Sequence, residues 1–302
     1  MPTARRRTRR RSFALLCLSL ALASGRALSA EPASAEPGDA GAPPGSDEET
    51  LEILPADELF VPPIADPTWP RFSAEHEWRL GSDQFDRVAQ VGFGETFAFV
   101  RDRLPGGGRW ETGLQAQVDA IFDMTASSFD LSNEDYFVAL TASVQRRGVT
   151  AQLRVSHLSS HVGDEYLLAN GGDRESVSYE TIDLLVSGEP IAQVRTYGGL
   201  GVLINPRPAF DPVYLQLGAE WRSPIAFARD HLRPVAGVDL RIPQEADWEP
   251  DVAGLVALRL ARPGDDTRHV DFFLRAYHGR SPEGQFFQQR VDLIGLGFRL
   301  GL

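Results

Sequence analysis

Residues 110 to 124 alternate between two kinds of side chain. The even positions are apolar in seven of eight cases: Trp110, Thr112, Leu114, Ala116, Val118, Ala120, Phe122 and Met124. The odd positions are polar or glycine in six of seven cases: Glu111, Gly113, Gln115, Gln117, Asp119, Ile121 and Asp123. A period of two predicts a β-strand, and this one is far longer than the average strand of about five or six residues. A long strand with one apolar and one polar face is typical of a transmembrane β-barrel, where the faces meet lipid and lumen.

The same alternation recurs in twelve segments from about residue 70 onward. We predict strands at 71–80, 87–101, 109–124, 135–146, 148–158, 176–187, 191–203, 212–222, 232–241, 250–261, 268–278 and 288–302. An even number is expected for a bacterial single-chain barrel. The alternative is a secreted β-sandwich or lipocalin-like barrel with its apolar face inward, and too many strands reach ten residues for that. The predicted fold class is therefore all-β, a closed antiparallel transmembrane β-barrel of about twelve strands.

The connections between these segments differ in length. The turns at 146–148 and 188–190 are tight, whereas four connections are long and rich in Gly, Pro, Asp and Asn: 159–175, 204–211, 242–249 and 279–287. Outer-membrane barrels have short periplasmic turns and long outer loops. Counting from a periplasmic N-terminus places all four long connections outside the cell. This pattern predicts location in the cell outer membrane of a Gram-negative-type bacterium.

The first 58 residues do not follow the barrel pattern. Six arginines within residues 5–11 precede the apolar stretch Phe13–Ala23 and small residues at 27–30, which together predict a signal peptide over residues 1–30. Residues 31–58 hold nine acids and no arginine among Pro, Ala, Gly and Ser. Such a segment buries too little apolar area to offset its ordering entropy, so we predict a disordered acidic linker before the barrel at 59–302. The alternative is an acidic tail that binds a partner.

Charge and cysteine content exclude several classes of protein. The formal net charge of −12 repels phosphate, so we expect no nucleic-acid partner. The single Cys excludes a disulfide framework and a zinc or iron–sulfur cluster built from cysteines. The expected partners are outer-membrane lipid and the barrel-insertion machinery, because the alternating segment 294–302 resembles the C-terminal strand by which outer-membrane barrels are recognised.

The polar face of the predicted strands carries charges of both signs. Its members are Gln152, Arg154, Gln193, Arg195, Gln216, Glu220, Asp239, Arg241, Asp251, Arg259, Asp271, Arg275 and Asp292. Opposite charges facing one lumen are expected to pair, because an unpaired buried charge is costly. A pore that selects ions more naturally presents one dominant sign. A plugged or narrow lumen is therefore predicted, with a small-solute pore as the alternative.

One short stretch has residues suited to catalysis. His157 and Ser159 stand two apart on one face of a predicted strand, at its outer end. This geometry allows the histidine to act as base for a serine nucleophile at the lipid boundary, and Asp164, Glu165 or Asn170 would orient the histidine. The His-x-Ser pair resembles that of outer-membrane phospholipase A and the lipid A deacylases, which implies acyl hydrolysis. The alternative is a polar loop rim without catalytic activity.

Metal binding has weaker support in the same region. Two histidines four residues apart can share a zinc ion when they lie on a helix, but His157 and His161 lie at the end of a predicted strand. Four acids near the predicted outer loop have the oxygen ligands that calcium prefers: Asp164, Glu165, Asp173 and Glu175. A solvated acidic loop has the same composition. We predict no cofactor and no metal site, with calcium as the alternative.

A second dense loop lies at the same predicted rim, at residues 278–287. We predict that it folds over the barrel mouth toward the loop 159–175, with Arg280 paired to Asp164 or Glu165. The expected outer-rim cluster comprises Ser160, His161, Glu165, Tyr166, His278, Arg280 and Ser281.

Three stretches resemble one uncharacterised family of bacterial outer-membrane proteins, known as domain of unknown function 1207. They are residues 159–166, 197–200 and 277–287. The resemblance implies an outer-membrane barrel and brings no activity with it. The expected function is an outer-membrane β-barrel of uncharacterised activity, structural or associated with the envelope. The alternatives are a phospholipid or lipid A acyl hydrolase using Ser159 and His157, or a small-solute pore.

Overall fold

A computed structural model describes residues 51–81, 85–170 and 177–301. The predicted signal peptide, most of the predicted linker and the last residue lie outside these ranges, as do Asp173 and Glu175. Within the described ranges, no helix is long and apolar enough to cross a membrane.

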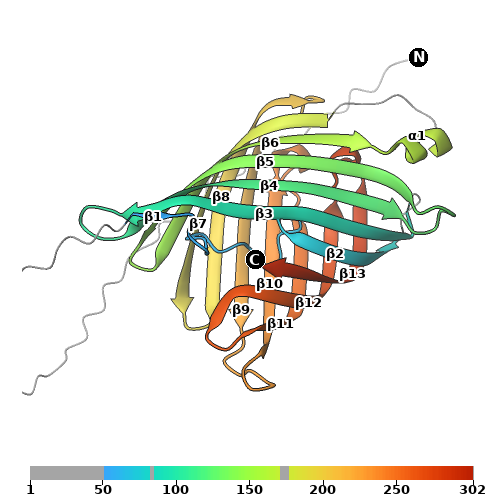
Figure 1. Cartoon of the computed structure of the whole chain (residues 1–302). Helices are drawn as coiled ribbons and strands as arrows, with labels where there is room; N and C mark the ends of the chain where they lie inside the picture. The colour runs from blue at the N-terminus through green and yellow to red at the C-terminus, as the bar shows by residue number, and fades with distance from the viewer. Residues whose placement is uncertain (1–50, 82–84, 171–176, 302) are drawn as a thin grey trace, which may run out of the picture. The chain divides into compact units, whose positions relative to one another are not determined.

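Twelve long strands form a closed antiparallel β-barrel (Figure 1). They are β2 (Phe72–Leu80), β3 (Arg87–Arg103), β4 (Arg109–Asp123), β5 (Asp130–Arg146), β6 (Val149–Val162), β7 (Val177–Ile191), β8 (Val194–Arg207), β9 (Val213–Arg222), β10 (Leu232–Pro243), β11 (Asp251–Arg262), β12 (Asp265–Arg280) and β13 (Arg290–Gly301). Each strand pairs with the next, and β13 pairs with β2, which closes the ring. The predicted fold class and strand number are confirmed. The largest boundary shift is at β5, which starts at Asp130 because that residue pairs with Asp123 of β4.

The alternation along each strand separates a lipid-type surface from the lumen. On β5, Val138, Leu140 and Val144 point outward and are exposed, whereas Thr141 and Ser143 point inward and are buried. Exposed apolar side chains recur on the outward face of eleven of the twelve strands, and those of β4 are half-buried. An apolar surface of this extent indicates that the outer face of the barrel meets lipid. Two residues depart from the predicted facing: Asp292 lies on the outward face of β13, and Gln193 lies in the exposed turn between β7 and β8.

Successive connections lie at alternate ends of the barrel because the strands are antiparallel. One end, which we call the turn end, carries residues 104–108, 147–148, 192–193, 223–231 and 263–264. The other, the loop end, carries the described residues of the connections after β2, β4, β6, β8, β10 and β12: 81, 85–86, 124–129, 163–170, 208–212, 244–250 and 281–289. Helix α1 (Asp164–Asn170) and the 3-10 turns η1 (Gln244–Ala246) and η2 (Gly284–Phe286) belong to the loop end (Figure 1). All four predicted long connections are therefore at one end, as expected.

The chain before β2 enters the barrel from the turn end. The short strand β1 (Glu52–Ile53) pairs with β3, and Asp57 forms an ion pair with Arg101 at 2.7 Å. Residues 51–58, which the sequence assigned to the disordered linker, thus contact the barrel wall. Residues 59–71 then lie inside the lumen, and we call them the plug segment.

Candidate functional site

The plug segment is held by side chains from three widely separated strands. Glu111 of β4 accepts a hydrogen bond from the Leu59 amide at 3.1 Å, and Glu220 of β9 accepts one from the Ile64 amide at 2.6 Å. The guanidinium of Arg299 on β13 donates to the Ile64 carbonyl. Because these strands lie apart around the ring, the segment crosses the lumen rather than following one wall.

Aromatic packing and an internal arginine complete the plug segment. Phe60 and Trp69 are buried and stack with their ring centroids 5.7 Å apart. Arg154 of β6 lies over the Trp69 ring, 4.5 Å from its centroid. Arg71 donates to the carbonyl oxygens of Pro63 at 2.8 Å and of Asp66 at 3.0 Å. These last two bonds hold the segment as a compact loop, because one side chain satisfies two of its backbone acceptors.

Ion pairs line the lumen wall beside the plug segment. Asp271 of β12 is fully buried and lies 2.8 Å from Arg259 of β11 and 2.8 Å from Arg299 of β13. Arg275 donates to Glu75 of β2 at 2.9 Å. The predicted pairing of opposite charges across the lumen is confirmed at these strands.

A further ion pair holds the 281–289 loop at the loop end. Glu283 lies 2.5 Å from Arg79 of β2 and accepts a hydrogen bond from Ser281. Burial is the largest influence on the pKa of Glu283 and raises it, but Arg79 and the bond from Ser281 outweigh burial. The pKa of Glu283 therefore lies below its ordinary value. Gln285 also donates to the Ser160 carbonyl at 2.7 Å, so the loop turns toward β6 as predicted.

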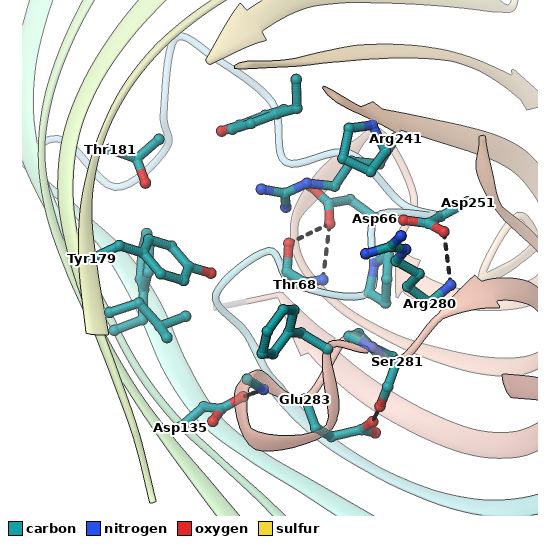
Figure 2. Close-up of a pocket in the computed structure, with 18 of the residues that line it drawn as sticks. Asp66, Thr68, Asp135, Tyr179, Thr181, Arg241, Asp251, Arg280, Ser281 and Glu283 are labelled. Carbon is teal, nitrogen blue, oxygen red and sulfur yellow. Dashed lines mark hydrogen bonds between the residues drawn. The ribbon is translucent and has the colours of Figure 1, made fainter. Parts of the chain in front are cut away.

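A cavity of about 210 Å³ lies between the plug segment and the 281–289 loop (Figure 2). Asp66 and Thr68 of the plug segment line one side, and Tyr179 and Thr181 of β7 line another. Burial raises the pKa of Asp66, but hydrogen bonds from Gln216 and Thr68 outweigh it, so that pKa is lowered. Asp66 therefore carries its negative charge at neutral pH.

Arg241 projects into this cavity beside an aromatic ring. Its guanidinium lies 4.0 Å from the centroid of the Tyr214 ring, a cation–π arrangement. Tyr214 lies against the wall because its partner on β8 is Gly201, where an added Cβ would come within 2.2 Å of the ring. The glycine thus makes room for the tyrosine, and the tyrosine supports the arginine.

Aromatic and acidic side chains mark the mouth of the cavity. The rings of Phe210 and Phe287 lie 4.4 Å apart, although they come from the 208–212 and 281–289 loops. Asp211 beside them is exposed, and Glu245 is half-buried. The cavity therefore reaches the loop-end surface between these groups.

The predicted catalytic residues lie on the outer face of β6. His157, Ser159 and His161 share the outward parity, near the loop end. Ser159 Oγ is 3.1 Å from His161 Nε2, whereas His157 Nδ1 is 3.2 Å from Glu180 Oε1 of β7. The structure thus brings the two predicted residues to one face and gives each a different hydrogen-bond partner. A serine–histidine pair exists here, with His161 in the position predicted for His157.

The predicted orienting residues occupy helix α1. Asp164 and Glu165 form its exposed first turn, and Tyr166 packs on Phe286 with ring centroids 5.5 Å apart. The predicted pairing of Arg280 with these acids is wrong. Arg280 instead donates its backbone amide to Asp251 and its guanidinium to the Glu245 carbonyl, because it ends β12, whose pairing with β11 places it beside Asp251 and η1.

The predicted outer-rim cluster is divided between the two sides of the wall. Ser160 and Ser281 are buried on the lumen side, and Ser160 hydrogen-bonds to Asp135. His278 faces outward and pairs with Asp292, as His161 faces outward beside Tyr136. Adjacent residues of a strand point to opposite faces, so Ser159 and Ser160 could not share one site. Among the described residues, no group of three or more His, Cys, Asp or Glu forms a metal-binding arrangement.

The sequence pattern did not predict that the residues lining the cavity come together. Arg241 belonged to the predicted polar face, but nothing in its neighbourhood along the chain distinguished it from the paired arginines. Tyr179 and Tyr214 come from strands far apart in sequence. Only closure of the ring brings these three side chains together.

The chain matches the family described as "Protein of unknown function (DUF1207)" over residues 31–302. No curated protein matches it. Among solved structures, outer membrane phospholipase A from Escherichia coli is 10% identical with a TM-score of 0.49, covering 81% of this chain and 95% of its own. The KdgM porin is 9% identical with a TM-score of 0.41, covering 76% and 98%. The β domain of the Bordetella autotransporter BrkA is 13% identical with a TM-score of 0.44, covering 78% and 98%.

Proposed function

From the premise that this chain belongs to the DUF1207 family of proteins of unknown function, we propose that it is an outer-membrane β-barrel closed by its own N-terminal segment. The observation that carries this proposal is the plug segment, residues 59–71, anchored across the lumen by Glu111, Glu220 and Arg299. The closed lumen gives the protein a structural or binding role in the envelope rather than that of an open pore.

Conductance of the refolded full chain in planar lipid bilayers tests the closure. The native chain is expected to show no sustained open level. Replacing both anchoring carboxylates, Glu111→Ala with Glu220→Ala, removes hydrogen bonds to charged acceptors worth roughly 1.5–3 kcal/mol each and should produce opening events. The matched control is Glu180→Ala, a carboxylate on the outer face of the wall. A steady open level from the native chain would contradict the proposal and favour the small-solute pore.

The proposed orientation has the turn end and the N-terminus in the periplasm. Four of the five turn-end connections have two to five residues, 223–231 being the exception, whereas the loop-end connections have five to fourteen, and this difference supports the orientation. The test uses single cysteines introduced into the barrel. The one natural cysteine, Cys17, falls in the predicted signal peptide and would be removed from the mature chain. An impermeant thiol reagent on intact cells should label Asp211→Cys at the loop end and spare Arg147→Cys at the turn end. The reverse pattern would invert the orientation.

Acyl hydrolysis at the outer face is the second candidate function. Its support is the 3.1 Å contact between Ser159 Oγ and His161 Nε2, at the loop end of the lipid-type surface. In this chemistry Ser159 Oγ attacks an acyl ester carbonyl while His161 Nε2 accepts its proton. The ester C–O bond then breaks, the histidine returns the proton to the departing alcohol oxygen, and water hydrolyses the acyl-serine to release the fatty acid. His157, paired with Glu180, lies beside the reacting pair.

Release of fatty acid from phospholipid vesicles by the refolded chain tests this second function. Ser159→Ala and His161→Ala should abolish release, whereas Ser178→Ala, the cross-strand neighbour of Ser159, should leave it unchanged. Equal release from the native chain and Ser159→Ala would remove the enzyme.

A further inference from the structure

Arg241 differs from the other arginines that face the lumen. Arg259, Arg275 and Arg299 each donate hydrogen bonds to buried carboxylates. Within the described residues, the guanidinium of Arg241 makes no hydrogen bond and no ion pair within 4 Å. It lies over the face of Tyr214 at 4.0 Å, and the carboxylates of Asp66, Asp183 and Asp239 are near enough to act on it electrostatically. Its planar array of N–H donors is therefore turned to the cavity unused. That array matches the geometry of a carboxylate or phosphate.

Hydroxyl groups around the same space are also without protein partners. Tyr179 and Thr181 extend from β7 into the cavity that Arg241 enters from β10 (Figure 2). In the described structure, neither their hydroxyls nor that of Tyr214 takes part in a hydrogen bond. These hydroxyls and the Arg241 guanidinium border the open space of the cavity, so they are available to a polar occupant.

The charge of the wall restricts what that occupant can be. Nine carboxylate side chains and three arginines line the cavity. Partners neutralise some of these carboxylates, such as Glu283 beside Arg79 and Asp183 beside Arg154, but carboxylates still outnumber arginines. A simple anion would be repelled by this acidic excess, and a simple cation would meet the guanidinium of Arg241. A ligand with an anionic group and a positive group satisfies both. The aromatic rings of Phe210 and Phe287 at the mouth offer contact to an apolar portion.

We propose that the cavity binds a small zwitterion of the amino-acid type. Its carboxylate would accept hydrogen bonds from Arg241 and Tyr179, and its ammonium would face Asp183 and Asp239. The inference goes beyond the closed barrel but rests on the plug segment, because Asp66 and Thr68 of that segment form one side of the cavity. Conductance tests the closure and ligand binding tests the cavity, so failure of one is distinguishable from failure of the other.

Isothermal titration calorimetry of the refolded full chain in detergent micelles tests the proposal. The probes form a matched set: L-phenylalanine as zwitterion, phenylalaninamide as cation, 3-phenylpropionate as anion, and glucose as an uncharged polyol. L-Phenylalanine should bind tightest, and loss of either charge should weaken binding about 10-fold or more. Equal binding of the three charged forms, preference for glucose, or no heat from L-phenylalanine at about 10 mM would overturn the proposal.

Variants locate the binding in the cavity. Arg241→Gln should weaken L-phenylalanine binding by about 10- to 100-fold, the range of a charge-assisted hydrogen-bonded pair. Tyr179→Phe keeps the aromatic ring and should weaken L-phenylalanine binding by roughly 2- to 10-fold. This variant tests the site even if Arg241→Gln does not refold. Arg146→Gln at the turn end is the matched control and should bind as the native chain does. Unchanged affinity in Tyr179→Phe or in refolded Arg241→Gln would refute the site.

Discussion

Asp271→Asn is expected to destabilise the barrel strongly. The Asp271 carboxylate is fully buried and accepts hydrogen bonds from Arg259 at 2.8 and 2.9 Å and from Arg299 at 2.8 and 3.0 Å. Arg299 also donates to the Ile64 carbonyl, so the same network reaches the plug segment. Asparagine keeps the volume of the side chain and removes its charge. The substitution therefore tests electrostatics without leaving a cavity.

The expected loss follows from what remains in the wall. In Asp271→Asn, Arg259 and Arg299 stay buried beside each other without their shared carboxylate. The single amide oxygen of asparagine replaces a carboxylate that accepted four hydrogen bonds. Removing one partner of a buried ion pair costs about 3–5 kcal/mol, since the remaining charge keeps its desolvation penalty. We expect a loss of this size in the free energy of unfolding. Release of Arg299 should also loosen the plug segment.

Asp292→Asn is the matched control, because Asp292 pairs with His278 on the exposed outer face of the same sheet. An exposed pair contributes about 0–1 kcal/mol, so this variant should unfold nearly as the native chain does. The assay is urea unfolding in lipid vesicles, followed by tryptophan fluorescence and by gel mobility without heating. Equal midpoints for Asp271→Asn and Asp292→Asn would refute the view that the lumen network stabilises the barrel. Partial recovery on adding Arg299→Gln would support it.

Three further predictions concern single positions. Burial and two neighbouring glutamates raise the pKa of Glu58 to about 8. The stability that the protonated Glu58 contributes is therefore fully present below about pH 4.5 and is lost as the pH rises through about 8. Glu58→Gln should reduce this loss of stability, measured as the urea midpoint against pH. The lowered pKa of Glu283 has the opposite sign: its stabilisation is present above about pH 4.5 and lost in acid, and an equally steep acid loss in Glu283→Gln would contradict this. Gly201→Ala should lower the free energy of unfolding by about 1–3 kcal/mol and displace Tyr214, because the added Cβ would overlap that ring. Gly254→Ala, with open space around the Cβ, should leave stability unchanged. Equal urea midpoints for the two variants would show that Gly201 does not constrain the Tyr214 ring.

The local pattern of the chain was sufficient to predict the barrel. Alternation with a period of two is a property of neighbouring residues, so strand number, the lipid-type face and the lumen face could be read before any contact was known. The outward placement of His157 and Ser159 followed from the same parity. Loop lengths likewise predicted which connections share an end.

Contacts between distant segments were beyond that reading. The plug segment has no periodicity, and its position depends on Glu111, Glu220 and Arg299, which the folded ring brings around it. Cross-strand register decided that His157 meets Glu180 and that Arg280, at the end of β12, meets Asp251 at the start of β11.

The sequence by itself determined a closed barrel with an apolar coat and a charged interior, because each strand records its two faces in the order of its residues. Only the tertiary structure decided which charges pair and which remain free. Arg241 and Arg275 look alike along the chain, yet ring closure places Arg275 against Glu75 and leaves Arg241 facing a cavity. Glu75 is 200 residues from Arg275 along the chain and lies near it only because β13 pairs with both β12 and β2, and no local pattern contains that closure.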